Sequence, residues 1–314
     1  MTPHLDLRLL AVGWLAGVGA VGGAAFGQTD PGRAPISTPK PPFVITFSGG
    51  LEHQFDADID GGGDFNVLRL GFGLESRSQP LPELDLSVKF NYALDAYSFS
   101  GAALGAADQW EDVHTFGLQA TASYRASREW TIFGGPILQI SRESGADWDN
   151  AFTGGAVIGA SYAFSEELVM GFGLGVLSQL EDSELIFPVL VLNWKISNDL
   201  RLTTQGGGRS ATGTGLELIW DRGDGWEFAV GGRYEFRRFR LDNSGDGPGG
   251  VGEETLVPFW VRASTQFDDN VTVSAYAGFT LGGGLLMEDQ NGNRIGKEDY
   301  DPAAFLGIFA KVTF

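Results

Sequence analysis

The chain has 314 residues, a formal net charge of −19, 47 glycines and no cysteine. The acidic balance excludes nucleic acid as a partner, because nucleic-acid binding needs clustered positive charge. A mean hydropathy of −0.03, together with the glycine content and 12% aromatic residues, fits neither a disordered chain nor a helical membrane protein.

Residues 1–27 have the pattern of a secretory signal peptide. An apolar run extends from Leu9 to Phe26, and small residues at its end predict cleavage near Gln28. The alternative, a membrane anchor, is disfavoured because the run is glycine-rich and short for a spanning helix of about 20 residues. Residues 28–42 contain five prolines, which predict an extended periplasmic linker without a core of its own.

The remainder, residues 43–314, alternates between apolar and polar residues. Between Leu84 and Asp95 every second residue is apolar, and almost all residues between them are polar. Such alternation separates the two faces of a strand, whereas a helix scatters the same residues around its circumference. Further apolar faces occur within 68–74, 116–124, 168–176, 257–263 and 271–279.

Thirteen connections separate the predicted strands and alternate in length. Six are short and polar, at 76–82, 127–129, 165–167, 197–199, 221–225 and 268–270. Seven are mostly longer and rich in Gly and Asp, near 56–63, 100–109, 143–151, 178–184, 207–213, 242–255 and 282–302. This pattern predicts an all-β up-and-down antiparallel barrel of about 14 strands, within a range of 12 to 16, with both termini on the short-turn side.

Aromatic residues gather beside the short connections. They are Tyr124, Trp130, Phe164, Trp194, Trp220, Trp226, Phe267 and Phe314. On the predicted outward face they form a ring at one membrane interface, where amphipathic aromatic side chains are most stable. A soluble β-sandwich, the alternative, explains the number of aromatic residues but not their position.

The last ten residues resemble the insertion signal on the final strand of bacterial outer-membrane β-barrels. The terminal Phe314 is preceded at alternate positions by Val312, Ala310, Ile308 and Leu306, which match the lipid-facing positions of that signal. The resemblance implies outer-membrane lipid and the barrel-assembly machinery as partners.

The sequence as a whole resembles an uncharacterised family of Gram-negative outer-membrane β-barrel proteins, a domain of unknown function. The segments that carry the resemblance are Arg237–Asp242, Val257–Arg262 and the Asn291-Gly292 pair. It implies a transmembrane barrel in the bacterial outer membrane. It implies no activity and no catalytic residue.

Charged residues on the predicted inward face are candidates for a lumen site. They include Arg69, Lys89, Arg233, Glu235, Arg237, Arg262, Asp85 and Glu217. Two interpretations stay open: a charged constriction that selects solutes, and a network of cross-strand ion pairs that only stabilises the barrel. Small inward residues such as Gly171, Gly173 and Gly175 predict free space in the lumen.

One acidic loop has the spacing of a calcium site. Asp242, Ser244, Asp246 and Glu253 fit a twelve-residue calcium loop, with Gly247 at the sharp turn. A solvated acidic loop without metal is the more common meaning of such spacing in an acidic chain. No other cofactor is expected.

The sequence favours no enzyme, because it has no Gly-x-Ser-x-Gly motif and His114 lacks a serine two residues away. The main prediction is a passive pore for small hydrophilic solutes. The alternative is a non-conducting structural or surface-interaction barrel whose loops bind divalent ions. A transporter of apolar molecules is disfavoured, because the predicted linker is too short to form a plug.

Overall fold

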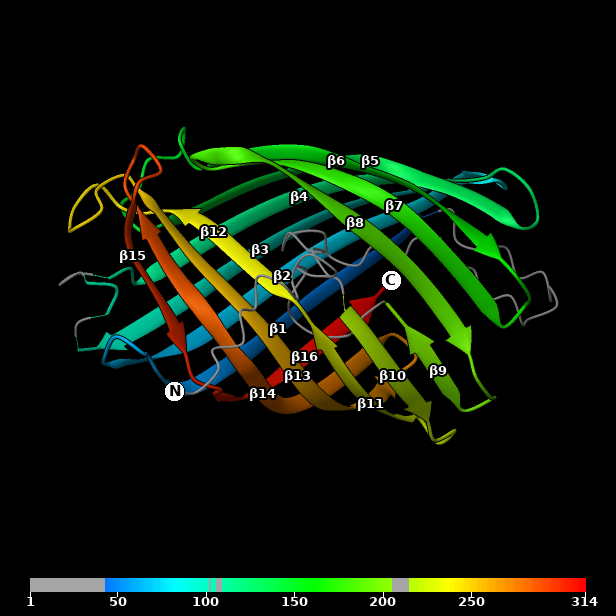
Figure 1. Cartoon of the computed structure of the whole chain (residues 1–314). Helices are drawn as coiled ribbons and strands as arrows, with labels where there is room; N and C mark the ends of the chain where they lie inside the picture. The colour runs from blue at the N-terminus through cyan, green and yellow to red at the C-terminus, as the bar shows by residue number, and fades with distance from the viewer. Residues whose placement is uncertain (1–42, 102, 106–108, 205–214) are drawn as a thin grey trace, which may run out of the picture.

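The computed structural model describes residues 43–101, 103–105, 109–204 and 215–314. Strands, turns and loops make up these ranges (Figure 1). Among the described residues, no helix has the length and apolar character needed to cross a membrane. The predicted signal peptide (1–27) and linker (28–42) lie outside the described residues and stay predictions.

Sixteen strand segments follow one another along the described chain. In order they are β1 (Phe43–Asp58), β2 (Asp64–Leu81), β3 (Leu84–Ser100), β4 (Asp112–Arg125), β5 (Trp130–Glu143), β6 (Phe152–Ala163), β7 (Leu168–Gln179), β8 (Asp182–Lys195), β9 (Leu200–Thr203), β10 (Gly215–Asp221), β11 (Trp226–Arg233), β12 (Glu235–Arg240), β13 (Val251–Asp268), β14 (Val271–Glu288), β15 (Arg294–Tyr300) and β16 (Ala304–Thr313).

These segments form a closed antiparallel barrel of 14 strands, as predicted. Each segment from β1 to β11 is hydrogen-bonded to the next, and the ladder continues through β13, β14 and β16 back to β1. Two strands are interrupted and therefore count as two segments each. The β11 strand continues into β12 after Tyr234, because both pair with β13; likewise β15 and β16 both pair with β14.

The outer face of the barrel is apolar. On β2, Leu70 and Phe72 are 41% and 46% exposed, whereas Arg69 between Leu68 and Leu70 is fully buried. Successive side chains of a strand point to opposite faces, so this contrast confirms the predicted inward and outward phases. The predicted aromatic ring is confirmed as well, since its eight members range from 40% exposed for Trp226 to 82% for Phe267.

Serine hydroxyls close three of the short turns. The Ser127 Oγ atom accepts hydrogen bonds from the backbone N–H groups of Glu129 (3.2 Å) and Trp130 (3.0 Å). Ser165 and Ser197 accept the corresponding bond from the residue two positions later. A side-chain acceptor at this position satisfies a turn amide that has no ladder partner, which explains why Ser recurs at this end. We call it the short-turn end.

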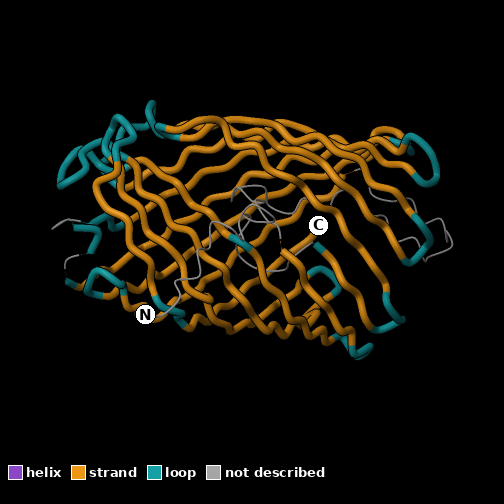
Figure 2. The backbone as a smooth tube through the Cα atoms, viewed as in Figure 1, coloured by secondary structure: helices purple, strands orange, loops and turns teal. Residues whose placement is uncertain are grey.

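The opposite end carries the longer connections and is called the long-loop end (Figure 2). The connections predicted at 178–184, 242–255 and 282–302 are shorter in the structure, because strands extend into these ranges. Strands β7 and β8 are joined by only Leu180 and Glu181, where the sequence predicted a loop over 178–184. Glu181 adopts a φ of 52°, in the left-handed region that tight hairpin turns require.

Strand β12 leaves the barrel wall and enters the lumen. The preceding segment β11, nearer the short-turn end, is paired on both sides, with β10 and β13. In the described part of the chain, β12 pairs only with β13 along its length, and its last residue Arg240 forms a single bridge with Arg142 on β5. Figure 1 shows β12 crossing in front of the strands on the far side. The chain therefore places one strand between two walls of its own barrel.

Candidate functional site

A buried arginine on β2 organises the lumen below the long loops. The Arg69 guanidinium is fully buried and lies 3.0 Å from Glu254 Oε1, 3.4 Å from Glu52 Oε1 and 4.0 Å from Asp95 Oδ1. It also donates a hydrogen bond of 3.2 Å to Gln54 Oε1. Burial of an isolated charge is strongly unfavourable, and these partners offset the desolvation cost of the Arg69 guanidinium.

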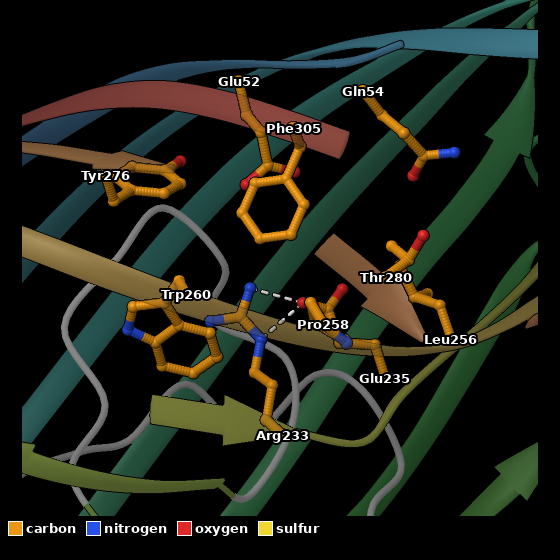
Figure 3. A pocket seen from close by; sticks show the side chains of 10 residues that line it. All are labelled: Glu52, Gln54, Arg233, Glu235, Leu256, Pro258, Trp260, Tyr276, Thr280 and Phe305. Carbon is orange, nitrogen blue, oxygen red and sulfur yellow. Dashed lines mark hydrogen bonds and ion pairs between the residues drawn. The ribbon is translucent and has the colours of Figure 1, made fainter. Parts of the chain in front are cut away.

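Strand β12 contributes further charged residues, which share partners with Arg69. Arg237 donates a 2.7 Å hydrogen bond to Glu254 and is also paired with Glu235. Glu235 is paired in turn with Arg233, where β11 ends (Figure 3). We call Glu52, Arg69, Asp95, Arg233, Glu235, Arg237 and Glu254 the ionic network; its three arginines and four carboxylates give a formal charge of −1.

The structure thus brings together four of the predicted lumen residues, namely Arg69, Arg233, Glu235 and Arg237. Their charges are compensated at short range, as the ion-pair interpretation predicts. The adjoining cavity, which Arg233, Trp260 and Phe305 help to line, has a volume of only about 10 Å³. This is about the space of one water molecule. No open charged constriction is present at this level in the described part of the chain.

Other predicted residues lie nearer the short-turn end. Arg262 contacts Glu217 at 2.8 Å, and Trp260 donates its indole N–H to the same carboxylate at 2.9 Å. Asp85 lies 3.9 Å from Arg125. Lys89 is directly opposite Glu75 in the β2–β3 ladder. These residues are therefore separate from the ionic network.

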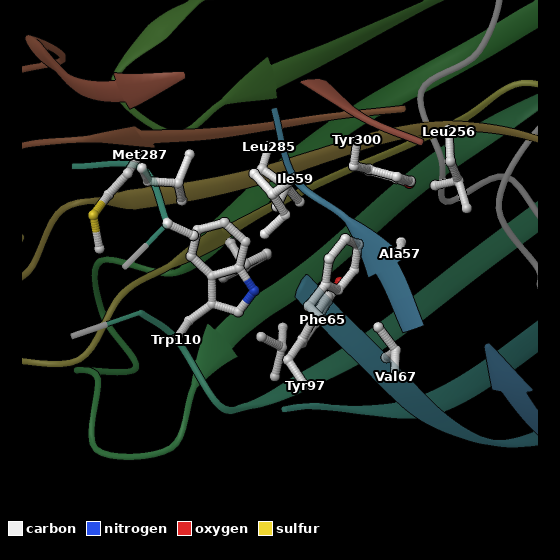
Figure 4. Close-up of a cluster of buried hydrophobic side chains, with 14 of the residues drawn as sticks. Ala57, Ile59, Phe65, Val67, Tyr97, Trp110, Leu256, Leu285, Met287 and Tyr300 are labelled. Atoms are coloured by element: carbon white, nitrogen blue, oxygen red, sulfur yellow. The ribbon is translucent and has the colours of Figure 1, made fainter. Parts of the chain in front are cut away.

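An apolar cluster is buried inside the barrel toward the long-loop end (Figure 4). Trp110 from the β3–β4 loop and Phe239 from β12 pack edge to face at 5.3 Å, and both are 1% exposed. Strands from several parts of the wall complete it. We call this cluster the long-loop core; its members are Ala57, Ile59, Phe65, Val67, Tyr97, Ala103, Leu104, Trp110, Val113, Phe239, Leu241, Leu256, Leu285, Met287, Tyr300 and Ala303.

The inward face of β5–β8 forms a second apolar surface, which the sequence analysis missed. We call it the apolar wall; it consists of Phe133, Ile137, Val157, Leu177, Phe187, Val189 and Val191. A Cβ atom on Gly175 would lie 2.0 Å from the Phe187 ring, so the space predicted at this glycine is taken by an aromatic side chain. The unbroken apolar run over 185–192 was the available signal, because it indicates a strand that is apolar on both faces.

The predicted calcium loop lies at the long-loop end. Asp242 accepts hydrogen bonds from the Ser244 N–H and hydroxyl, whereas Glu253 is paired with Arg238 at 2.7 Å. Asp242, Ser244 and Asp246 border a polar cavity of about 260 Å³. Within the described residues, no three His, Cys, Asp or Glu side chains are arranged to hold a metal ion. Calcium binding stays a prediction from the sequence.

Three solved structures have similar folds. An outer membrane channel from Pseudomonas putida F1 is 15% identical, with a TM-score of 0.48, over 91% of this chain and 100% of that chain. A FadL homologue from Pseudomonas aeruginosa is 9% identical, with a TM-score of 0.46, over 86% and 89%. The toluene transporter TodX from P. putida is 10% identical, with a TM-score of 0.42, over 88% and 91%. No family model and no curated protein matches the chain.

Proposed function

We propose that the protein is an outer-membrane channel for small solutes and that its cell-surface end is closed in this structure. The observation that carries the proposal is the difference between the two halves of one lumen. Side chains of the long-loop core are buried to within a few per cent, whereas the inward-facing Arg125 and Arg201 near the short turns are 38% and 50% exposed. A lumen that is packed at one end and accessible to water at the other has the form of a closed channel.

The outer surface supports residence in a membrane. Its strands present large apolar side chains to the surroundings, and the aromatic ring lies at the short-turn end. Such an arrangement is stable with hydrocarbon around the wall and aromatic side chains at the interface. By the usual orientation of such barrels, the short turns face the periplasm and the long loops face the cell exterior.

The element that closes the lumen is β12, with part of the β3–β4 loop. The two contribute Phe239 and Trp110 to the long-loop core, and β12 also contributes Glu235 and Arg237 to the ionic network. Since β12 is hydrogen-bonded along only one edge in the described chain, its displacement breaks fewer backbone bonds than removal of a wall strand. Passage of a solute would therefore require movement of β12.

The polar inward residues near the short turns support hydrophilic solutes, the class predicted from the sequence. The apolar wall favours a second candidate, small apolar solutes, because β5–β8 offer them a continuous surface inside the barrel. The non-conducting, surface-interaction alternative is supported only by the acidic loops.

Planar-bilayer recording tests the channel directly. We expect rare openings for the wild-type protein and frequent ones for Trp110→Ala/Phe239→Ala, which removes two large side chains from the long-loop core. Phe279→Ala is the control, because that side chain is 59% exposed on the outer face. Heat-modifiable migration on a detergent gel checks that each variant is folded. If the folded double variant is as silent as the control at every voltage, the channel proposal is wrong.

A substitution in the apolar wall separates the two solute classes. Val189→Asp is added to the Trp110→Ala/Phe239→Ala variant. If the solutes are hydrophilic, liposome swelling by small sugars should be unchanged by this substitution. If they are apolar, the same substitution should abolish uptake of a labelled aromatic hydrocarbon, because a carboxylate disrupts the apolar surface.

A further inference from the structure

A group of positive charges faces the lumen near the short-turn end and lies apart from the ionic network. It consists of Arg77 on β2, Lys89 on β3 and Lys311 on β16. Each is on the inward phase of its strand. Arg77 shares the phase of the buried Arg69, and Lys311 shares that of the buried Phe305. The neighbours Val88 and Phe90 of Lys89 are 49% and 37% exposed on the outer face. We call these three residues the basic patch.

The strand register brings the basic patch together across β1. Lys89 is opposite Glu75 on β2, which is opposite Thr46 on β1. Lys311 is opposite Ser48, two residues further along β1. Lys89 interacts electrostatically with Glu75, Arg77 and Lys311, which places all four charges on one section of the wall.

The patch has an excess of positive charge. Among the described residues its one carboxylate partner is Glu75, which lies 2.5 Å from Arg77 Nε. Three cations and one carboxylate leave a formal charge of +2. Neither lysine forms an ion pair with another described residue, unlike the arginines of the ionic network. An unpaired ammonium group in a narrow lumen attracts an anion from solution.

The wall between the two lysines is small and polar. The row that contains Lys311 continues through Ser48, Gly73 and Asn91. A Cβ atom on Gly73 would lie 2.6 Å from the Ser48 hydroxyl, so the Ser48 side chain lies over this glycine. Hydroxyl and amide groups next to ammonium groups are suitable donors for an oxyanion.

We propose that the basic patch is an anion-binding site for small organic carboxylates. The positive charge selects the sign of the ligand, and Ser48 and Asn91 supply neutral donors beside it. Because the long-loop core fills the opposite end, the ligand reaches the site from the short-turn end in this closed state. The inference deepens the proposed channel function and rests on it, since it assigns negative charge to a transported solute.

Calorimetric titration of the purified barrel with benzoate tests the site, with neutral benzamide as the matched ligand. We expect benzoate to bind at least about tenfold more tightly than benzamide, because only the carboxylate forms charge-assisted hydrogen bonds. Binding should weaken with added salt, since the lumen at this end is accessible to water. Equal affinity for the two ligands, or no heat from benzoate, overturns the proposal.

Substitutions assign the binding to the patch. Lys89→Gln/Lys311→Gln should weaken benzoate binding about tenfold or more, whereas Lys89→Arg/Lys311→Arg should retain it. Lys195→Gln is the matched control, because Lys195 lies on β8 and outside the patch. If the Gln and Arg variants bind benzoate equally, the site is elsewhere. The titration requires no transport, so its failure is distinguishable from silence in the planar bilayer.

Discussion

The two halves of the lumen differ in how they accommodate charge. In the long-loop half, charged groups are buried and each is matched by partners on other strands, as Arg69 is by Glu52, Asp95 and Glu254. In the short-turn half, Arg262 and Glu217 form one buried pair at 2.8 Å, but Arg125 and Arg201 remain accessible to water and form only long ion pairs. Strand β12 and part of the β3–β4 loop fill the long-loop half, and β12 brings both apolar and charged side chains into it.

Removal of one buried partner should have the largest effect. Glu254→Gln removes the nearest carboxylate that Arg69 and Arg237 share, and leaves them only Asp95 in common, at 4.0 Å and 3.8 Å. We expect a loss of roughly 3–5 kcal/mol, because breaking a buried ion pair leaves the remaining charges poorly compensated. Denaturant unfolding of the refolded barrel measures it. Glu75→Gln in the short-turn half is the control, with an expected loss of about 0–1 kcal/mol because its partner Arg77 is 42% exposed. Equal losses would mean that the two halves do not differ in this way.

Truncation within the long-loop core should come next. Leu285 is fully buried, so Leu285→Ala should cost about 2–5 kcal/mol through lost contacts and the resulting cavity. Leu281 lies on the same strand but is 61% exposed, and Leu281→Ala should cost less than about 1 kcal/mol. Chemical unfolding in detergent compares the two. A Leu285→Ala variant as stable as Leu281→Ala would contradict a packed long-loop half.

Neighbouring positions on β3 test which side chains face lipid and which face the lumen in the short-turn half. Phe90 faces outward, and Phe90→Arg should destabilise the inserted barrel by about 2–4 kcal/mol near the membrane midplane. Lys89→Gln should be nearly neutral for insertion, because this side chain faces the lumen. Folding into lipid vesicles gives the comparison, and the reverse ranking would invert the register of this strand.

Loss of a hydrogen bond to a carboxylate in the β14–β15 loop should have the smallest effect on stability. Hydrogen bonds from Asn293 and Asn291 lower the pKa of Asp289. The resulting stabilisation of the loop is present above the ordinary carboxyl pKa of about 3.9 and is lost as the pH falls through the lower folded pKa. Asn293→Ala should raise the pKa towards the ordinary value, as measured by carboxyl NMR titration. An unchanged titration would show that the loop does not hold this carboxylate.

Alternation in the sequence predicted the barrel, its 14 strands and its outward residues, because lipid requires one uninterrupted apolar face. The departure of β12 was not predicted. The odd-numbered residues from Glu227 to Phe239 all lie on the inward phase. The alternation of inward and outward residues therefore continues across Tyr234 and does not indicate where β12 leaves the wall. Arg238 and Arg240 were the available signal, because they occupy the phase that faces lipid in β11, where arginine is unfavourable.

Glu254 was missed for a local reason. The Gly-rich and acidic composition over 242–255 predicted a loop, whereas β13 begins at Val251. Glu254 is separated from the inward residues Trp260 and Arg262 by even numbers of residues, so it lies on the same face of the strand. A longer predicted strand would have included it. The partners of Arg69 could not be derived from the sequence, because Glu254 is 185 residues away along the chain.

Cysteine accessibility most directly tests the claim that the lumen is filled at one end and open to water at the other. The chain contains no native cysteine, so each substitution gives a single reporter. Val67→Cys and Leu285→Cys lie in the long-loop core, and Ser48→Cys and Lys311→Cys face the lumen near the short turns. With a small hydrophilic thiol reagent, we expect the first pair to react on the order of 100-fold more slowly, because reaction there requires local opening. Equal rates at all four positions would contradict the account.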